Sequence, residues 1–415
     1  MRLGAVLSFA VALGAKETAL VFPLLLAAAY LLLPVTTCGQ DSNPVRRNLP
    51  RQLTLLLAPY LLLVVVDIAY RHLVLGAGAM GGNWAGIALA VRLWTAPRLI
   101  LSYLTLPLRF ASLTVCDDYA LSTGLDPASL AAAGVVILLL IGVALSFGRW
   151  PQLGFAAVWM LVSLLPALNL IPILHYRADR FFYFPFVGWS LAVVTVAQRA
   201  IDAFARAESR GRWRRQAAIA GSAALLGLAV FTVWRNTLFA DDRRLFEATV
   251  AVSPFCREAH TGLGDAYLRL GRDQDAVAQY ELARAPRPGR VSYVVLPKVL
   301  INLGMAQLAR RDYAAAEAAF TEAHQRQPGL LHPLFGLGVA NLALGRISTG
   351  VSWLEQAYAL DATDPDVSFN LALGYDRLGR RAEASAMYRQ YLAIAPHGRA
   401  RELAQQRLQA LTSAP

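Results

Sequence analysis

Residues 257–288 read REAHTGLGDAYLRLGRDQDAVAQYELARAPRP, and this stretch carries the firmest structural signal in the chain. It has small residues at its eighth and twentieth positions, an aromatic residue at position 24 and Pro at position 32. The pattern recurs with starts at 257, 297, 331 and 365, so successive copies begin 40, 34 and 34 residues apart. Small residues let two helices approach closely, and the Pro ends the second helix. Each helix pair buries one face against its neighbour, so the stack is the stable unit.

This pattern resembles the tetratricopeptide repeat, whose period is about 34 residues. The resemblance implies an α-solenoid over 257–398, a degenerate half repeat or connector over 236–256, and a capping helix with a tail over 399–415. In the degenerate copy, Phe246 and Pro254 would take positions 24 and 32. Such stacks bind peptides or proteins on their concave face. Five polar residues of the first helices are candidates for that face, each with an ordinary solvated position as the alternative: Asn302, Gln307, Asn341, Asn370 and Arg377.

The composition indicates membrane spans joined to a soluble part. Apolar residues make up 56% of the 415 residues and charged residues 16%, against about 25% charged in soluble proteins. A transmembrane helix needs about 20 mostly apolar residues. The candidate spans are 18–34, 53–69, 129–147, 153–171, 183–198 and 216–234. We therefore predict an all-α protein, with a polytopic transmembrane helical bundle over 1–235 followed by the repeat solenoid.

Two apolar stretches are less regular. Residues 3–15 form either a first helix, which we favour, or a signal peptide. Residues 84–108 carry Arg and Pro, and we expect a re-entrant or interfacial segment there.

The distribution of basic residues predicts the orientation. Loops 35–52 and 199–215 are rich in Arg, and such loops face the cytoplasm. The repeats would then lie on the periplasmic or outer side of a bacterial inner membrane. The formal net charge is +12, but the basic residues lie between apolar runs, so we predict membrane lipid and not nucleic acid as a partner.

Three polar clusters would face the outer side: Lys16-Glu17-Thr18, Cys116-Asp117-Asp118-Tyr119 and His175 to Arg180. Lys and Arg at an interface suit a lipid phosphate, and paired carboxylates suit a divalent cation or a general base. The alternatives are a paired turn, an exposed acidic turn and an aromatic belt, respectively. The three Cys lie at 38, 116 and 256 without zinc spacing, so no metal site is predicted. A Cys116–Cys256 bridge stays open.

The order of several short motifs resembles a known family. Lys16-Glu17-Thr18 is similar to its S-K-E-T element, with Ala15 in place of Ser. The segment from Tyr103 to Tyr119 is similar to its Y-L…P…D-Y loop. Asn169 to Gly188 is similar to its N-L-x-P…[DE]-R-Y-L-Y-x-P-S-x-G segment, with Phe186 where Ser is usual. These are motifs of the transmembrane-and-tetratricopeptide-repeat proteins, which are similar to protein O-mannosyltransferases of the GT-C fold.

The resemblance implies transfer of a sugar from a polyprenyl-phosphate donor to a hydroxyl group of a translocated protein, with a divalent cation as a candidate cofactor. By position, Lys16, Arg177 and Arg180 would bind the lipid phosphate, and Asp118 and Asp179 would be supporting acids. The family's catalytic acid lies in an outer loop after the first span, and no acidic loop precedes Lys16. We therefore expect the chain to correspond to the carboxy-terminal portion of such a protein, assign no catalytic residue and leave open whether it is an enzyme.

Two further functions compete with glycosyl transfer. One is a non-enzymatic, membrane-anchored tetratricopeptide-repeat scaffold for envelope protein assembly. The other is a transporter, although no inverted repeat is evident.

Overall fold

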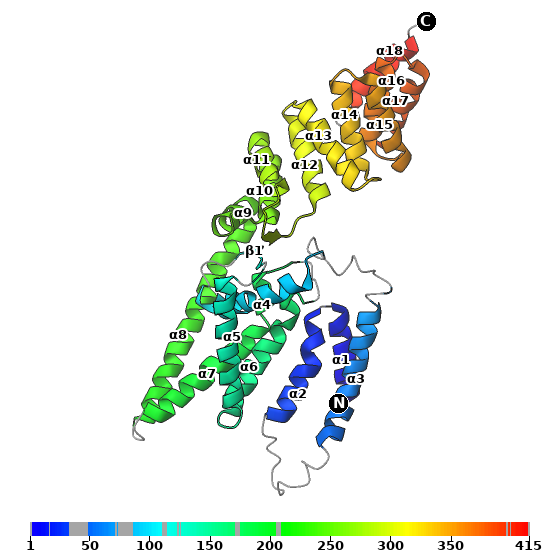
Figure 1. Cartoon of the computed structure of the whole chain (residues 1–415). Helices are drawn as coiled ribbons and strands as arrows, with labels where there is room; N and C mark the ends of the chain where they lie inside the picture. The colour runs from blue at the N-terminus through cyan, green and yellow to red at the C-terminus, as the bar shows by residue number, and fades with distance from the viewer. Residues whose placement is uncertain are drawn as a thin grey trace. The chain divides into compact units, whose positions relative to one another are not determined.

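The computed structural model describes residues 2–15, 17–32, 49–70, 73, 86–109, 114–122, 124, 126–170, 175–204, 209–395, 397–398 and 400–413. Apart from one short two-stranded ribbon, the elements of this part are helices, so the all-α prediction is confirmed with that exception (Figure 1). The chain divides into two compact units. The amino-terminal unit comprises Met1–Asp241, Ala248–Cys256 and Arg287–Tyr293, and the repeat unit comprises Asp242–Glu247, Arg257–Pro286 and Val294–Pro415.

The amino-terminal unit is built from helices and short 3-10 turns. In chain order these are α1 (Arg2–Ala15), η1 (Glu17–Val21), α2 (Phe22–Leu32), α3 (Leu49–Tyr70), α4 (Leu89–Leu104), η5 (Leu106–Leu108), β1 (Asp118–Ala120), α5 (Pro127–Ser146), α6 (Pro151–Leu164), η7 (Leu165–Leu168), η8 (Asp179–Phe182), α7 (Pro185–Phe204), α8 (Arg210–Asn236) and η9 (Thr237–Ala240). Helix α6 packs against α2, α5 and α7, and α4 packs against α5. Helix α6 thus contacts three other helices, and α4 also contacts η7, the turn that continues α6.

Local sequence signals explain where α5 and α6 begin. Each starts with a Pro, which is tolerated in the first turn because that position needs no intrahelical N–H bond. Asp126 caps α5 by accepting a 2.8 Å hydrogen bond from the backbone N–H of Ser129. Hydrogen bonds from Ser122 and Ser129 lower the pKa of Asp126 to about 2. The cap is therefore a charged carboxylate at the positive end of the helix dipole.

Among the described residues, four helices are long and apolar enough to cross a membrane, judged by length and composition: Arg51–Tyr70, Pro127–Ser146, Pro151–Leu168 and Arg210–Ala240. Two predicted spans turn out differently. The described part of 18–34 is divided between η1 and the 11-residue α2, and most of 183–198 lies in α7, whose last turns carry Arg199 and Asp202. Within 84–108, the helices are α4 and η5, with the break at Thr105.

The repeat unit is a stack of helix pairs (Figure 1). Its helices are α9 (Asp242–Val252), whose second half belongs to the amino-terminal unit, α10 (Arg257–Arg269), α11 (Asp273–Arg284), α12 (Leu296–Ala309), α13 (Tyr313–Arg326), α14 (Leu331–Ala343), α15 (Ile347–Leu360), α16 (Pro365–Arg377), α17 (Arg381–Ile394) and α18 (Arg401–Ser413). Strand β2 (Arg290–Ser292) lies between α11 and α12 in the sequence and belongs to the amino-terminal unit. The first helices α10, α12, α14 and α16 each touch the next one along the stack. They therefore form one continuous face.

The small residues of the motif lie where two helices come closest. A Cβ atom added at Gly304, position 8 of the second repeat, would fall 2.7 Å from the ring of Phe320, which is at position 24. One added at Gly262 would fall 2.3 Å from the ring of Phe246, the residue aligned with position 24 of the degenerate copy. The aromatic residue thus occupies the volume that a side chain at the glycine would need.

The last helix covers the open end of the stack. Helix α18 packs against α17, and its Ala404 is fully buried in the cluster that contains Tyr388 and Tyr391. A polar outer face on α18 closes the apolar end of the solenoid.

Candidate functional site

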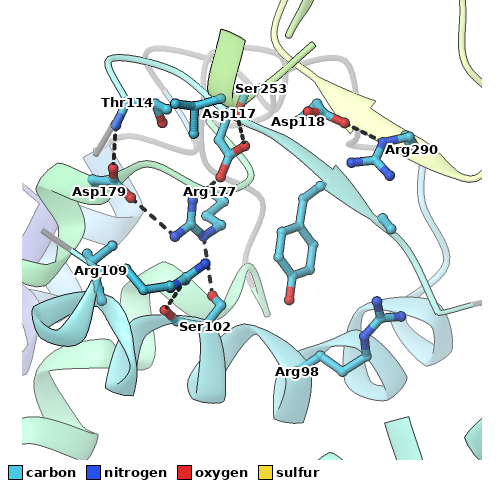
Figure 2. A pocket seen from close by; sticks show the side chains of 14 residues that line it. Arg98, Ser102, Arg109, Thr114, Asp117, Asp118, Arg177, Asp179, Ser253 and Arg290 are labelled. Atoms are coloured by element: carbon cyan, nitrogen blue, oxygen red, sulfur yellow. Dashed lines mark hydrogen bonds and ion pairs between the residues drawn. The ribbon is translucent and has the colours of Figure 1, made fainter. Parts of the chain in front are cut away.

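A cavity of about 330 Å³ lies in the amino-terminal unit, and charged side chains dominate its lining (Figure 2). Its walls come from α4, Arg109, residues 114–120 with β1, residues 177–179 at the start of η8, the end of α9, and β2. The charged residues are Arg98, Arg109, Arg177, Arg290, Asp117, Asp118 and Asp179. The cavity therefore collects charge from α4, from the residues between α4 and the end of β1, from residues 177–179 and from β2.

Arg177 is the centre of this cluster. Its side chain is 6% exposed, forms an ion pair with Asp117, and lies 3.2 Å from Asp179 Oδ1. Its Nε donates to Ser102 Oγ at 3.2 Å, and its guanidinium lies 5.5 Å from the centre of the Tyr103 ring. A buried cation is stable only with such partners. Arg177 therefore ties α4, the loop before β1 and η8 together.

The two carboxylates beside Arg177 have other partners as well. Asp179 Oδ2 accepts a 2.7 Å hydrogen bond from the backbone N–H of Thr114. Asp117 Oδ1 accepts a 2.6 Å hydrogen bond from Ser253 Oγ, at the end of α9. Both carboxylates thus accept a hydrogen bond besides their contact with Arg177, and both contribute to the walls of the cavity.

Asp118 is paired separately, through the ribbon. Strand β1 runs antiparallel to β2, with Asp118 opposite Ser292 and Ala120 opposite Arg290. The Asp118 carboxylate is 3% exposed and forms an ion pair with Arg290. The guanidinium of Arg290 also lies 5.1 Å from the centre of the Phe255 ring. The ribbon thus carries one acid–base pair at the rim of the cavity.

Arg98 is the cation with the fewest partners. It is half-buried and makes no hydrogen bond or ion pair with any residue that the structure describes. Burial raises the pKa of the Tyr119 phenol to about 12, and the positive charge of Arg98 opposes that rise. Figure 2 shows Arg98 and Arg109 on the α4 side of the cavity, opposite the loop that carries Asp117 and Asp118. The positive charge on this side can attract an anion, whereas Asp117 and Asp179 share the charge of Arg177 and Asp118 is paired with Arg290.

The structure brings together three of the five residues predicted for a lipid-phosphate site. Arg177, Asp118 and Asp179 line the same cavity. Arg180 does not line it, because its exposed guanidinium turns to His175 Nδ1 at 3.0 Å and to the Phe181 ring. Lys16 lies outside the described residues. The phosphate-binding roles themselves stay predictions.

The acids of this cavity are poorly suited to a divalent cation. Asp117 and Asp179 share Arg177, and Asp118 is paired with Arg290. Within the described ranges, no group of three or more His, Cys, Asp or Glu side chains is placed to hold a metal ion. No step that needs a cation is therefore assigned to this site.

The sequence motifs did not identify several of the residues that line the cavity. Ser253 lies in the segment 236–256, predicted as a degenerate half repeat or connector, and Arg290 lies in the range 257–398, predicted as repeats. One signal for Arg290 was present, because the first two repeats start 40 rather than 34 residues apart. The additional residues include β2, whose Arg290 reaches the cavity. Nothing comparable in the sequence marks Arg98 or Ser253.

The proposed binding face of the repeats contains both accessible and occupied residues. Asn302 donates to Asp265 Oδ1 at 2.8 Å, Asn370 to the Asp366 carbonyl at 2.8 Å, and Arg377 to the Leu342 carbonyl at 3.0 Å. These three side chains keep some exposed surface. They remain candidates for a contact with a partner.

Asn341 and Gln307 are placed differently. Asn341 is fully buried and donates to Glu317 Oε1 at 3.1 Å and to the Leu337 carbonyl at 2.9 Å. Gln307 is at the same repeat position and is 7% exposed. Both occupy position 11, which packs inside the stack, so neither presents its amide to a partner in this conformation.

The repeat unit matches family models. Residues 234–291 and 301–365 match one model of the tetratricopeptide repeat, and residues 365–397 match a second. The carboxy-terminal region therefore consists of tetratricopeptide repeats, as the spacing predicted.

Among curated proteins, the chain is 30% identical over 188 residues to the cytochrome c-type biogenesis protein CycH of Bradyrhizobium diazoefficiens. The match covers 45% of this chain and 46% of the relative, so it spans less than half of either.

Solved structures with a similar fold include tetratricopeptide-repeat proteins. YrrB, one of these, shares 17% identity with a TM-score of 0.35, covering 42% of this chain and 87% of that one. Another is TTC0263 of Thermus thermophilus, which shares 23% identity with a TM-score of 0.32, covering 46% and 96%. MamA shares 18% identity with a TM-score of 0.33, covering 37% and 86%.

Proposed function

We propose that this protein is a membrane-anchored tetratricopeptide-repeat scaffold that binds protein partners during the assembly of envelope proteins. The observation that carries the proposal is the continuous face formed by α10, α12, α14 and α16. The apolar helices of the amino-terminal unit support an anchoring role. The likeness to a cytochrome c-type biogenesis protein favours cytochromes of that type as the assembled product.

A strip of side chains on the first helices offers the contacts that a peptide needs. Lys298, at position 2 of its repeat, lies 3.3 Å from Asp265, at position 9 of the preceding repeat. Met305 and His332 occupy the same two positions at the next junction, and both are exposed. Lys298 is 58% exposed. We call Asp265, Lys298, Met305 and His332 the first-helix strip; it combines both charges with an apolar contact.

The test uses a deletion strain of the source organism, complemented with the full chain. We expect deletion to lower the amount of assembled c-type cytochromes, measured by haem staining of membrane proteins after denaturing electrophoresis. The triple variant Lys298→Glu, Met305→Glu, His332→Glu should fail to restore them, because it reverses or adds charge along the first-helix strip.

A matched control places the same number of Glu substitutions on the second helices. Ala318→Glu, Ala359→Glu and Arg389→Glu lie on exposed positions of α13, α15 and α17, and this variant should restore the cytochromes. Unchanged cytochromes in the deletion strain would refute the assembly role. Equal failure of both triple variants at equal protein level would refute the first-helix strip as the binding face.

A glycosyltransferase that uses a polyprenyl-phosphate sugar is the second candidate. Arg98 and Arg109 of the cavity favour this candidate, because they offer positive charge to a phosphate. Arg177 does not favour it, because two carboxylates already contact its guanidinium. The paired state of Asp118 and Asp179 argues against either as a free general base. In the same strains, glycan staining of envelope proteins tests this candidate. Loss of glycans on deletion, and in Arg98→Ala but not Arg180→Ala, would support it.

A further inference from the structure

Two buried thiols lie in the amino-terminal unit beside the cavity. Cys116 is 2% exposed and sits in the bend two residues before β1. Cys256 is fully buried and ends the turn that follows α9. Both are in the thiol form in the structure. Neither has a part in the scaffold role proposed above.

Two contacts place the segments that carry these cysteines next to one another. Ser253 Oγ donates to Asp117 Oδ1 at 2.6 Å, which joins the residue after Cys116 to the turn that contains Cys256. Ser292 Oγ lies 3.8 Å from Cys256 Sγ. Ser292 is also the ladder partner of Asp118, two residues after Cys116.

These contacts place both cysteines beside the same end of the ribbon. Residues opposite one another in an antiparallel ladder have Cα atoms about 4.5–5.5 Å apart, and a disulfide needs Cα atoms about 4.4–6.8 Å apart. Asp118 and Ser292 are such a pair, Cys116 lies two residues before Asp118, and Cys256 Sγ lies beside Ser292. A disulfide therefore requires the bend at Cys116 to move toward Cys256.

We propose that Cys116 and Cys256 form a disulfide when the chain meets an oxidising thiol–disulfide pool. The bond joins the wall formed by Thr114, Asp117 and Asp118 to the wall formed by Val252 and Ser253. It closes a long loop that contains α5 to α8. The cavity is then held by a covalent link as well as by its ion pairs, and the third cysteine, Cys38, stays reduced.

The chemistry balances with oxidised glutathione as the electron acceptor. One cysteine thiolate attacks the glutathione disulfide, forming a mixed disulfide and releasing one glutathione thiolate. The second cysteine thiolate then attacks the protein sulfur of that mixed disulfide and releases the second glutathione. The two protein thiols lose two protons and two electrons in total, and one oxidised glutathione becomes two reduced glutathiones.

The test uses the full chain in detergent micelles and needs no partner protein, so its result is independent of the scaffold role. The chain is equilibrated with reduced and oxidised glutathione, in one series with a low concentration of urea so that the reagent reaches buried thiols. It is then alkylated under denaturing conditions and analysed by intact-mass and peptide mass spectrometry. We expect a species lighter than the reduced chain by two hydrogen atoms, one alkyl group on Cys38, and a cross-linked peptide pair that contains Cys116 and Cys256.

Three variants complete the design. Cys116→Ser and Cys256→Ser should each abolish the loss of two hydrogen atoms, whereas the matched control Cys38→Ser should keep it. The oxidised wild-type chain should unfold about 5 °C higher than oxidised Cys116→Ser, because the cross-link restricts the unfolded chain. Full alkylation of both cysteines at every glutathione ratio, with and without urea, would overturn the proposal. So would a cross-link that involves Cys38.

Discussion

At the scale of single residues, Arg177 lies at the predicted site, but its charge has a different partner from the predicted one. An Arg next to aromatic residues at a membrane face suits a lipid phosphate, and that was its predicted function. In the structure its charge is engaged by Asp117 and Asp179 inside the protein. Arg180, which has the same chemistry, is exposed beside His175. The different roles of Arg177 and Arg180 therefore follow from their burial and not from their residue type.

Arg177→Ala should therefore destabilise the chain strongly. Removal of the guanidinium leaves the mostly buried carboxylates of Asp117 and Asp179 without a cation, at a cost of about 3–5 kcal/mol. The matched variant Arg180→Ala should change stability by about 0.5 kcal/mol or less, because its side chain is exposed. Thermal unfolding of each full chain in detergent, followed by size-exclusion chromatography, measures the difference. Equal melting temperatures for the two variants would contradict a structural role for Arg177.

A second single-residue feature lies between the helices of the repeats. Position 15 is Gly271, Gly345 and Gly379 in three repeats, each with φ between 69° and 80°. The second repeat has Arg311 there, with φ of 61°. A side chain in this left-handed region costs about 1–2 kcal/mol.

Arg311→Gly should consequently raise stability, by about 0.5–1 kcal/mol after the larger entropy of Gly in the unfolded chain is subtracted. The neighbouring Arg310→Gly should lower it, since Arg310 has a φ of −78° that any residue adopts. Thermal unfolding by circular dichroism distinguishes a rise from a fall. A lower melting temperature for Arg311→Gly would show that strain at this position is absent.

At the scale of elements, the β1–β2 ribbon explains the irregular repeat spacing. The first two repeats are separated by additional residues, and β2 lies among them. Its partner β1 comes from the segment after α4, about 170 residues earlier in the chain. The ribbon pairs Asp118 with Arg290. The additional residues between the first two repeats thus supply one wall of the cavity.

A double-mutant cycle on Asp118→Asn and Arg290→Ala should measure this link. Asp118 is almost fully buried whereas Arg290 is partly exposed, so we expect a coupling free energy of about 1–2 kcal/mol. Each single variant should lower the melting temperature, and the double variant should lower it by less than the sum. Strictly additive effects would mean that the ion pair does not stabilise the ribbon.

At the scale of the whole molecule, orientation in a membrane is the property that most affects function. In the part of the chain that the structure describes, four helices are long and apolar enough to cross a bilayer. From the end of α7 to the start of α8, the sequence carries six Arg: Arg199, Arg206, Arg210, Arg212, Arg214 and Arg215. Because Lys and Arg in short connections favour the cytoplasmic side, the repeats are expected on the opposite side.

Fusions of alkaline phosphatase should test that orientation. A fusion after Leu411 should be active, because the enzyme requires export, and a fusion within 199–215 should be inactive. Green fluorescent protein at the same two sites serves as the reciprocal control and should fluoresce only in the loop. The reversed pattern would place the repeats in the cytoplasm and would also remove the oxidising compartment for Cys116 and Cys256.

Sequence periodicity was sufficient for the repeats. Their helices form from residues within one copy, and Gly304 meets Phe320 only 16 positions along the chain. Spacing therefore predicted the helix pairs and the close approach of two helices at the small residues. It failed at Asn341, because a polar residue at position 11 looks the same whether it is solvated or bonded to Glu317 inside the stack.

The cavity, in contrast, could not be predicted from sequence periodicity. Its charged pairs join residues 60 positions apart, as in Arg177 and Asp117, and 172 positions apart, as in Asp118 and Arg290. Amino-acid order alone established helix-forming, apolar and repeating segments, since those depend on neighbours in the chain. The packing of distant segments decided which Arg forms an ion pair, which Arg can attract an anion, and which cysteines lie near one another. The sequence could not predict these features, because an electrostatic partner acts through space and leaves no local pattern.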